Sequence, residues 1–193
     1  PTYSGGLGVL AGDTLRGAAD LGVPMVGVTL LHRKGYVRQG LDSQGSQLES
    51  PQDWSPDSVL QPVEPRVAVN IEGRQVHVRA WRYLTEGVSG HRVAIYLLDT
   101  NLPENSASDR ALTDYLYGGD DRYRLCQEVI LGMGGVAMVR ALGHTAIRTF
   151  HMNEGHSALL RLALLAERTG GLGLEALGSP DIEAVRRQCV FTT

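Results

Sequence analysis

Three short motifs combine glycines with polar or charged residues at spacings suited to ligand binding. The first, Ser4-Gly5-Gly6-Leu7-Gly8, opens an apolar helical pattern. Unpaired backbone N–H groups and the positive end of the helix dipole lie at such a helix start, so an anionic or polar ligand could approach the glycines closely. The spacing fits neither a dinucleotide fingerprint nor a nucleotide-binding P-loop. A tight structural turn and a ligand cradle both remain open for this loop.

The second motif joins a glycine pair to two carboxylates in Tyr117-Gly118-Gly119-Asp120-Asp121, directly before a long helical pattern. Aspartate is favoured at a helix start because it accepts hydrogen bonds from free N–H groups, so the structural interpretation is a helix cap. Arg124 falls in the first turn of that helix, where a positive charge opposes the dipole. We therefore expect an anionic partner for Arg124, and Asp120 or Asp121 could provide it.

The third motif, His151-Met152-Asn153-Glu154-Gly155-His156, follows a short apolar run. Open α/β sheets bind ligands at the carboxyl ends of their strands, which is where this motif would lie. A metal site needs a third ligand with suitable spacing, and the sequence offers none, so no metal is predicted. His156 or Glu154 could act in acid–base catalysis, but a hydrogen-bonded positioning role is favoured.

Apolar periodicity predicts the elements that carry these motifs. A helix at 7–21 should end before Gly22, and the polar stretch at 40–65 should be a surface excursion. Alternation around Glu72-Gly73-Arg74 indicates a hairpin. The remaining expected elements are a buried parallel strand at 23–31, β segments at 66–84 and 91–98, a long helix at 123–142, a strand at 146–152, helices at 157–168 and 179–188, and a final strand from 189.

The alternation of strands and helices predicts an α/β fold with an open, mostly parallel sheet and an antiparallel insertion near 66–98. At 193 residues and 42% hydrophobic composition, the chain can form one sizeable core, so one domain or part of one is expected. Gly132, Gly134 and Gly135 lie inside the long helix, where each costs about 1 kcal/mol relative to alanine. Close packing of this helix against strands is the simplest explanation.

Composition narrows the classes of partner. The net charge of −3 comes with interspersed signs, so nucleic acid is not an expected partner. Apolar runs such as 23–31 are too short to cross a bilayer, and the first residues lack the pattern of a leader, so a soluble, cytoplasmic protein is expected. Cys126 and Cys189 lie in apolar surroundings without a CxxC spacing, which favours buried thiols.

Several stretches in a fixed order resemble the α-glucan (glycogen, starch and maltodextrin) phosphorylases, particularly their shorter bacterial branch. They are PTYSGGLGVLAGDTLRGAAD at 1–20, IYLLDT at 95–100, LYGGDDRYRLCQEVILGMGG, HMNEGHSA and the final VFTT. The resemblance covers most of the chain except about 40–65 and 169–182. Several motifs in one order are far more specific than any single motif.

The resemblance implies a two-domain glycosyltransferase of the B type, with two Rossmann-like domains and the active site between them. Such an enzyme cleaves the terminal α-1,4 bond of a glucan with inorganic phosphate, releases glucose 1-phosphate, and uses pyridoxal phosphate in proton transfer. The cofactor's lysine and the basic residues that hold phosphate belong to the C-terminal domain, which this chain lacks. Residues 1–193 would then be part of an N-terminal domain, truncated at both ends and inactive alone, from a parent that could be a homodimer.

The resemblance also implies roles for individual residues, although it assigns no catalytic residue to this chain. Main-chain N–H groups of the glycine loop would approach the phosphate and the glucosyl unit, and two of its glycines would also adjoin the cofactor. A mobile gate with an arginine behind it, and a pocket near the sugar, would complete the site. The substrate-binding residues so implied are Gly5, Gly6, Leu7, Asp120, Asp121, Arg124, Asn153 and His156, with Gly5 and Gly6 also cofactor-binding.

Two alternatives remain at this point. A glycogen or starch synthase shares the fold and a similar glycine loop, but usually has a lysine two residues before the first loop glycine, where this chain has Tyr3. That difference favours a phosphorylase. The second alternative is a carbohydrate-binding module without catalysis, against which the retained Gly5, Gly6, Asp120 and His156 argue weakly.

Overall fold

The computed structural model describes residues 6–116, 118–170 and 172–192. Helices and strands alternate near both ends of the chain, as expected, whereas the middle holds a run of strands followed by a run of helices. The elements are α1 (Gly6–Asp20), β1 (Val26–Leu30), β2 (Val37–Leu41), β3 (Gln47–Pro51), η1 (Pro56–Ser58), β4 (Gln61–Ile71), β5 (Arg74–Glu86), β6 (Arg92–Asp99), α2 (Ala107–Arg110), η2 (Ala111–Thr113), α3 (Asp121–Val129), η3 (Ile130–Gly134), α4 (Gly135–Ala141), β7 (Phe150–Asn153), η4 (Gly155–Ser157), α5 (Leu160–Arg168), η5 (Leu174–Ala176), α6 (Ser179–Gln188) and β8 (Cys189–Thr192).

The central sheet has the strand order β1-β6-β5-β4 and mixes both strand directions. β1 is parallel to β6, whereas β5 is antiparallel to both β4 and β6. The α/β class and the antiparallel segment are thus confirmed. The expectation of a mostly parallel sheet is wrong for the described residues, in which three of the five strand pairings are antiparallel. The reason is local: short turns connect β4, β5 and β6, and short turns force antiparallel pairing.

The turn between β4 and β5 consists of Glu72 and Gly73, which lie between the paired residues Ile71 and Arg74. Both turn residues have positive φ, at 52° and 79°. A two-residue turn of this kind matches the twist of the flanking strands, which confirms the predicted hairpin. β4 forms the outer edge of the sheet, and its register shifts between Pro62 and Arg66.

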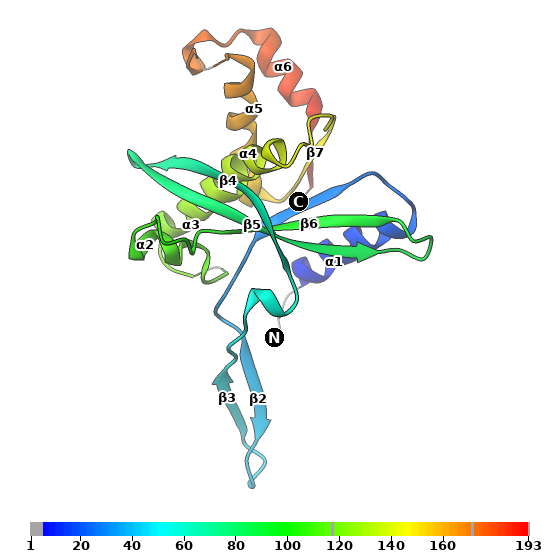
Figure 1. Ribbon diagram of the computed structural model, residues 1–193, viewed down its shortest axis with the longest axis vertical. Coiled ribbons are helices and arrows are strands. Elements are labelled where there is room, and N and C mark those ends of the chain that lie inside the picture. Colours follow the sequence, from blue (N-terminus) through cyan, green and yellow to red (C-terminus); the bar gives the residue numbers. More distant parts are fainter. Residues whose placement is uncertain (1–5, 117, 171, 193) are drawn as a thin grey trace.

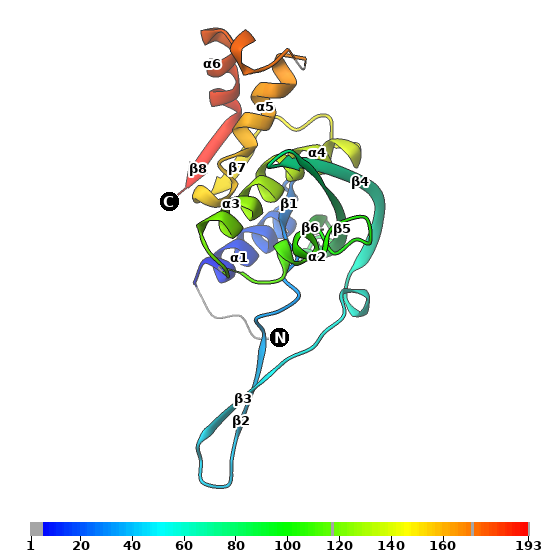
Figure 2. The same ribbon diagram turned by 90° about the vertical axis from the view of Figure 1, so that its left-hand side faces the viewer.

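The two faces of the sheet pack against different elements, because successive side chains on a strand point to opposite faces. On one face, Tyr96 and Leu98 of β6 belong to the largest core cluster, together with Ile130 and Met138 from the helical segment α3-η3-α4. On the other face, Val93 packs against α1. Figure 2 shows the two helical layers around the sheet.

The long helix expected at 123–142 is present, but its middle turn is π-helical over Ile130–Gly134. The glycines of this helix allow strands and a neighbouring helix to approach its backbone closely. A Cβ at Gly135 would lie 3.3 Å from Val28 of β1, and one at Gly134 would contact Val69 and Val78, in agreement with the predicted packing against strands. Gly132 instead faces a helix start: a Cβ there would lie 2.7 Å from the backbone nitrogen of Leu160.

Two pairs of elements extend from the central sheet toward opposite ends of the molecule (Figure 1). The β2–β3 hairpin lies at one end, and its turn is held by Asp42, which accepts hydrogen bonds from the N–H groups of Gln44 and Ser46. Most of this hairpin lies in the polar stretch at 40–65, and β2 begins just before it. The sequence predicted that this stretch is a surface segment but did not predict its two strands. At the other end, α5 and α6 accompany the parallel pair of β7 and β8.

Neither cysteine is in a disulfide. Cys126 is buried, as expected, whereas Cys189 is half-buried, and burial raises the pKa of both thiols. Across the described ranges, no helix combines the length and apolar character needed to cross a membrane.

Candidate functional site

A cavity of about 1530 Å³ runs along β1 and β7 and is bordered by α1 and by the helical segment α3-η3-α4. Residues that follow the carboxyl ends of the two strands line it, namely His32 after β1 and His156 after β7. Asn153, the last residue of β7, and Arg124 of α3 also line it. The structure therefore brings Arg124, which follows the second motif, together with Asn153 and His156 of the third motif on one cavity.

The glycine motif is only partly visible. Gly5 lies outside the described residues, and so does the side chain of Leu7. Gly6 is the first residue of α1 and is exposed, and Gly8 lines the cavity. A Cβ placed on Gly6 would meet no atom within 4 Å. Among the described residues, nothing about packing requires a glycine at this position.

Asp120 is the N-cap of α3, as the structural interpretation predicted: its Oδ1 accepts a hydrogen bond of 2.8 Å from the N–H of Tyr123. Asp121 begins the helix, and both carboxylates are exposed and do not line the cavity. Within the described ranges, Arg124 forms no ion pair with either carboxylate, so the partner expected for it is not found there. Its side chain is exposed and contributes positive charge to the cavity wall.

Glu154 and His156 form a compact pair after β7. The Glu154 Oε2 atom lies 3.6 Å from His156 Nε2, an ion pair whenever the imidazole is protonated. The backbone of Glu154 has φ 61° and ψ −167°, a region that only glycine adopts without strain. Strain of this kind persists where surrounding contacts impose it, and here the N–H of Glu154 donates to the carbonyl of Thr192 at 2.9 Å. The arrangement suits a positioning role for Glu154.

Replacing Glu154 with glycine is expected to raise the free energy of unfolding by about 1 kcal/mol. Relief of about 1–3 kcal/mol of backbone strain is partly offset by the greater freedom of glycine in the unfolded chain. Denaturant unfolding of Glu154→Gly beside Glu154→Gln, which keeps the strain, measures the difference. A glycine variant less stable than the glutamine variant would show that the side-chain contact with His156 outweighs the strain.

His32 is a cavity residue that sequence reasoning missed. Its Nδ1 lies 3.1 Å from the carbonyl oxygen of Thr113, and because a carbonyl can only accept, Nδ1 carries the hydrogen. Burial lowers the pKa of His32 and outweighs this hydrogen bond, which raises it, so the neutral imidazole is favoured. Nε2 is then left as an acceptor. The available signal was position alone: His32 stands directly after a buried strand.

A buried carboxylate, also missed, organises the carboxyl end of β6. Asp99 is fully buried and accepts hydrogen bonds from Arg33 Nη2 at 2.6 Å, Arg79 Nε at 2.9 Å and Trp81 Nε1 at 2.9 Å. The backbone N–H of Asn101 donates to it as well. Asp99 thus ties the segment after β1 to β5 and β6. No group of three metal-ligating side chains occurs in the described part of the chain.

No protein-family model matches the chain. Over its whole length it is 40% identical to the maltodextrin phosphorylase of Thermococcus litoralis and 39% identical to the glycogen phosphorylase of Mycobacterium tuberculosis, covering 23% of each. The glycogen phosphorylase of Aquifex aeolicus is 34% identical over 99% of the chain, which covers 27% of that protein. The chain thus spans about a quarter of the length of these relatives. Along its whole length, the chain is homologous to a segment of the glycogen and maltodextrin phosphorylases, the family that its motifs resemble.

Proposed function

We propose that the polypeptide carrying this segment is an α-1,4-glucan phosphorylase, which transfers terminal glucosyl units of glycogen or maltodextrin to inorganic phosphate and releases glucose 1-phosphate. One observation carries the proposal: 39–40% identity over the whole chain to proteins named glycogen or maltodextrin phosphorylase. The substrates and partners are therefore an α-glucan, phosphate and glucose 1-phosphate. The cytoplasmic location expected from composition stays a prediction.

The groups around the cavity support this assignment chemically. A sugar presents hydroxyls that both donate and accept hydrogen bonds, and the Asn153 amide offers both functions. Neutral His32 offers an acceptor at Nε2, and His156 adds a second imidazole to the same cavity. The first N–H groups of α1, which have no partner within the helix, and the positive charge of Arg124 suit an anion such as phosphate. In this proposal, the segment binds and orients substrate.

Pyridoxal phosphate does not fit the residues present as a covalent cofactor. A Schiff base needs a lysine whose amine can lose its proton, and Lys34 is the one lysine of the sequence. Its Nζ lies 2.8 Å from Asp114 Oδ2, and this hydrogen-bonded ion pair raises the pKa of Lys34. The ammonium is held protonated. If the whole enzyme uses this cofactor, its lysine comes from another part of the polypeptide, and Gly5 and Gly6 would at most adjoin it.

We propose further that the segment is part of a Rossmann-like N-terminal domain. β1 and β7 each have one hydrogen-bonded neighbour among the described strands, and both line the same cavity. The walls of that cavity are largely apolar, as Val26, Val28 and Phe150 illustrate. A further strand of the whole protein, parallel to β1, would pair with the free edge and extend the parallel part of the sheet. The second domain of such an enzyme would then lie outside residues 1–193.

Replacing Gly6 with alanine in the whole enzyme is expected to reduce glucose 1-phosphate release at least tenfold. A Cβ would stand between the first N–H groups of α1 and a bound ligand, while no described atom lies within 4 Å to be disturbed. Gly12→Ala is the matched control, because Gly12 lies in the same helix with equally open surroundings. Phosphate-dependent release from maltodextrin measures both variants.

The outcomes separate the possible functions. Release that depends on phosphate in the wild type and collapses only in Gly6→Ala supports both the phosphorylase and the glycine loop. Equal activity of the two variants would remove the loop from the site. Transfer from a sugar nucleotide without phosphate-dependent release would instead establish a synthase.

A further inference from the structure

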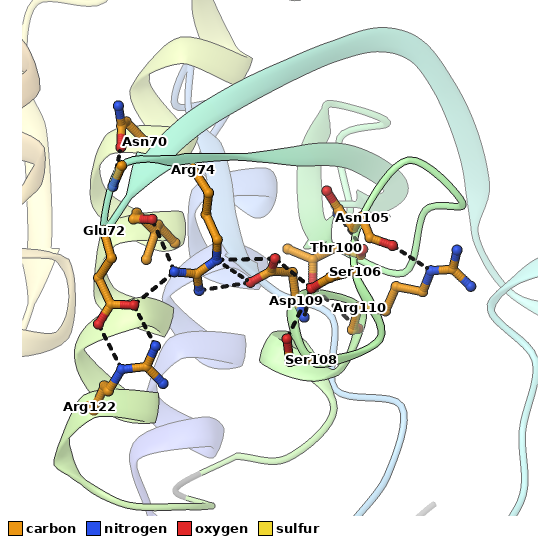
Figure 3. Close-up of polar contacts among 12 residues, drawn as sticks. Asn70, Glu72, Arg74, Thr100, Asn105, Ser106, Ser108, Asp109, Arg110 and Arg122 are labelled. Atoms are coloured by element: carbon orange, nitrogen blue, oxygen red, sulfur yellow. Dashed lines mark hydrogen bonds and ion pairs between the residues drawn. The ribbon is translucent and has the colours of Figure 1, made fainter.

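The four residues 112–115, which we call the brace, connect the end of β1 to the helix α3 through their backbone carbonyl groups. The first three residues of the brace are at most 7% exposed. The helix α2, which ends shortly before the brace, is held by Arg74, which donates to Asp109 at 2.8 Å (Figure 3). The brace is therefore a buried part of the chain that follows a well-anchored helix.

Two cavity-lining side chains donate hydrogen bonds to the brace. The amide nitrogen of Gln127, on α3, donates to the carbonyl of Leu112 at 2.8 Å and to that of Tyr115 at 2.9 Å. The Nδ1 atom of His32, at the end of β1, donates to the carbonyl of Thr113 at 3.1 Å. The same short segment thus holds one side chain from a strand end and one from a helix.

These contacts determine which polar atom of each side chain is left over. Because a carbonyl can only accept, both hydrogens of the Gln127 amide are used by the brace, and Oε1 remains as an acceptor. In the same way, His32 carries its hydrogen on Nδ1 and keeps Nε2 as an acceptor. Burial lowers the pKa of His32, which favours the neutral ring that this acceptor requires. Both side chains are therefore held as acceptors.

Both acceptors are accessible from the cavity, which Gln127 and His32 line. Gln127 is only 7% exposed, so the small accessible part of its side chain matters. In the described ranges, Gln127 Oε1 and His32 Nε2 accept no hydrogen bond. Neither atom is enclosed by protein, because the buried side-chain atoms without a partner there are Trp54 Nε1 and Arg82 Nε. The two acceptors face space that a ligand can enter.

The chemistry of two acceptors favours a ligand that brings hydrogen-bond donors. A sugar hydroxyl can donate to each of them, whereas the ionised oxygens of a phosphate can only accept. Arg124, whose guanidinium group has donors alone, lines the same cavity and suits the anion instead. The cavity thus offers different groups to the hydroxyls of a sugar and to a phosphate.

We propose that His32 and Gln127 are hydroxyl-binding residues: Nε2 of His32 and Oε1 of Gln127 each accept a hydrogen bond from a glucosyl hydroxyl group, and the brace fixes both side chains in that orientation. This inference rests on the proposed phosphorylase function and deepens it by naming residues that recognise the sugar. Because the brace orients the acceptors before the sugar binds, binding costs little side-chain freedom. A site of this kind discriminates against a ligand that lacks the matching hydroxyl.

The first test separates the free acceptor of His32 from its contact with the brace, in the whole enzyme. His32→Asn keeps an N–H donor as many bonds from Cα as Nδ1 but has no group at the position of Nε2. We expect the Kd of maltoheptaose, measured by calorimetry, to rise about threefold to tenfold, which corresponds to one neutral hydrogen bond. His32→Gln can place an oxygen acceptor as many bonds from Cα as Nε2 and should recover most of this loss.

His91→Gln is the matched control for these variants. His91 lines the same cavity, but its Nε2 atom already lies 3.1 Å from the carbonyl of Val23, a contact that glutamine can keep. The Kd of maltoheptaose should therefore stay unchanged. If His32 acted only by supporting the brace, His32→Asn would bind the sugar better than His32→Gln, which is the opposite order to the one expected.

The second test changes the ligand. In analogues of glucose 1-phosphate, fluorine in place of one hydroxyl keeps a similar size but cannot donate a hydrogen bond. The wild-type enzyme should bind at least two such analogues about threefold to tenfold more weakly than glucose 1-phosphate, one for each acceptor. His32→Asn should be insensitive to one of these replacements and remain sensitive to the other, whose hydroxyl is assigned to Gln127.

Four outcomes would overturn the proposal: no binding of maltoheptaose by the wild-type enzyme, an unchanged Kd in His32→Asn, weaker binding by His32→Gln than by His32→Asn, or equal sensitivity of wild type and His32→Asn to every fluorine replacement. The proposed function fails separately. If the sugar binds as expected but the wild-type enzyme releases no glucose 1-phosphate from maltodextrin and phosphate, the phosphorylase assignment is wrong and the hydroxyl-binding role stands.

Discussion

Replacing Asp99 with asparagine is expected to lower the free energy of unfolding by about 3 kcal/mol. The variant leaves the guanidinium groups of Arg33 and Arg79 without a charged partner, although both are mostly buried. Breaking a buried ion pair on one side costs about 3–5 kcal/mol, and the amide keeps part of the hydrogen bonding. Asp13→Asn is the control, since Asp13 forms an exposed pair with Arg16 and should change stability by less than about 0.5 kcal/mol.

The loss of stability caused by Asp99→Asn should become smaller as the pH falls. Burial raises the pKa of Asp99, but hydrogen bonds from Arg33, Trp81 and the Asn101 N–H outweigh it and leave the pKa below its ordinary value of 3.8. Because the pKa of Asp99 is lower in the folded protein than in the unfolded chain, its ionised carboxylate stabilises the fold at pH values above 3.8. This stabilisation is lost as the pH falls through the pKa of the folded protein. Urea unfolding at several pH values should therefore show that the free energies of unfolding of the wild type and Asp99→Asn converge below about pH 4. A gap that persists undiminished in acid would contradict the role of the charge.

Replacing Gly132 with alanine is expected to lower the free energy of unfolding by about 2 kcal/mol, even though alanine favours helices by about 1 kcal/mol. A Cβ there would stand 2.7 Å from the backbone nitrogen of Leu160 and 2.9 Å from the carbonyl carbon of Leu159. Backbone atoms cannot rotate away as a side chain can. Either the π-helical turn or the start of α5 must move, and α5 follows directly after the turn that holds His156.

Gly17→Ala is the matched control for this prediction. Gly17 lies inside α1, where a Cβ would meet nothing within 4 Å, so alanine should stabilise the protein by about 0.5–1 kcal/mol. Opposite signs for the two substitutions in thermal or denaturant unfolding are the expected result. A stabilised Gly132→Ala protein would mean that the π-helical turn does not press against α5 as closely as described.

Local patterns predicted most of the elements well. The alternation around Glu72-Gly73 gave the hairpin, and apolar spacing gave the helix that starts near Asp121, because both depend on neighbours along the chain. The antiparallel direction of β5 and β6 was predicted as well, because the short gap between the two segments leaves no room for a helical crossover. The β2–β3 hairpin was missed because its residues are polar on both faces and show no alternation, as at Gln39 and Glu49.

The candidate site was predictable only where a motif is contiguous. Asn153 and His156 lie where the rule for open sheets puts them, and the cap at Asp120 follows from residue preference. His32 was missed because its partner, the carbonyl of Thr113, lies far along the chain. Asp99 was missed for the same reason: the contacts that hold it appear only once distant segments are packed together.

The outer edge of the sheet has a consequence for solubility. A free strand edge exposes a row of N–H and C=O groups that can pair with another chain and start aggregation. The first half of β4 carries Pro62, Glu64 and Pro65, and its register breaks between Pro62 and Arg66. Proline removes a hydrogen-bond donor, the charge resists burial, and the irregularity interrupts the flat edge. β4 thus protects this side of the protein from unwanted edge-to-edge assembly while the rest of the strand holds the turn at Glu72.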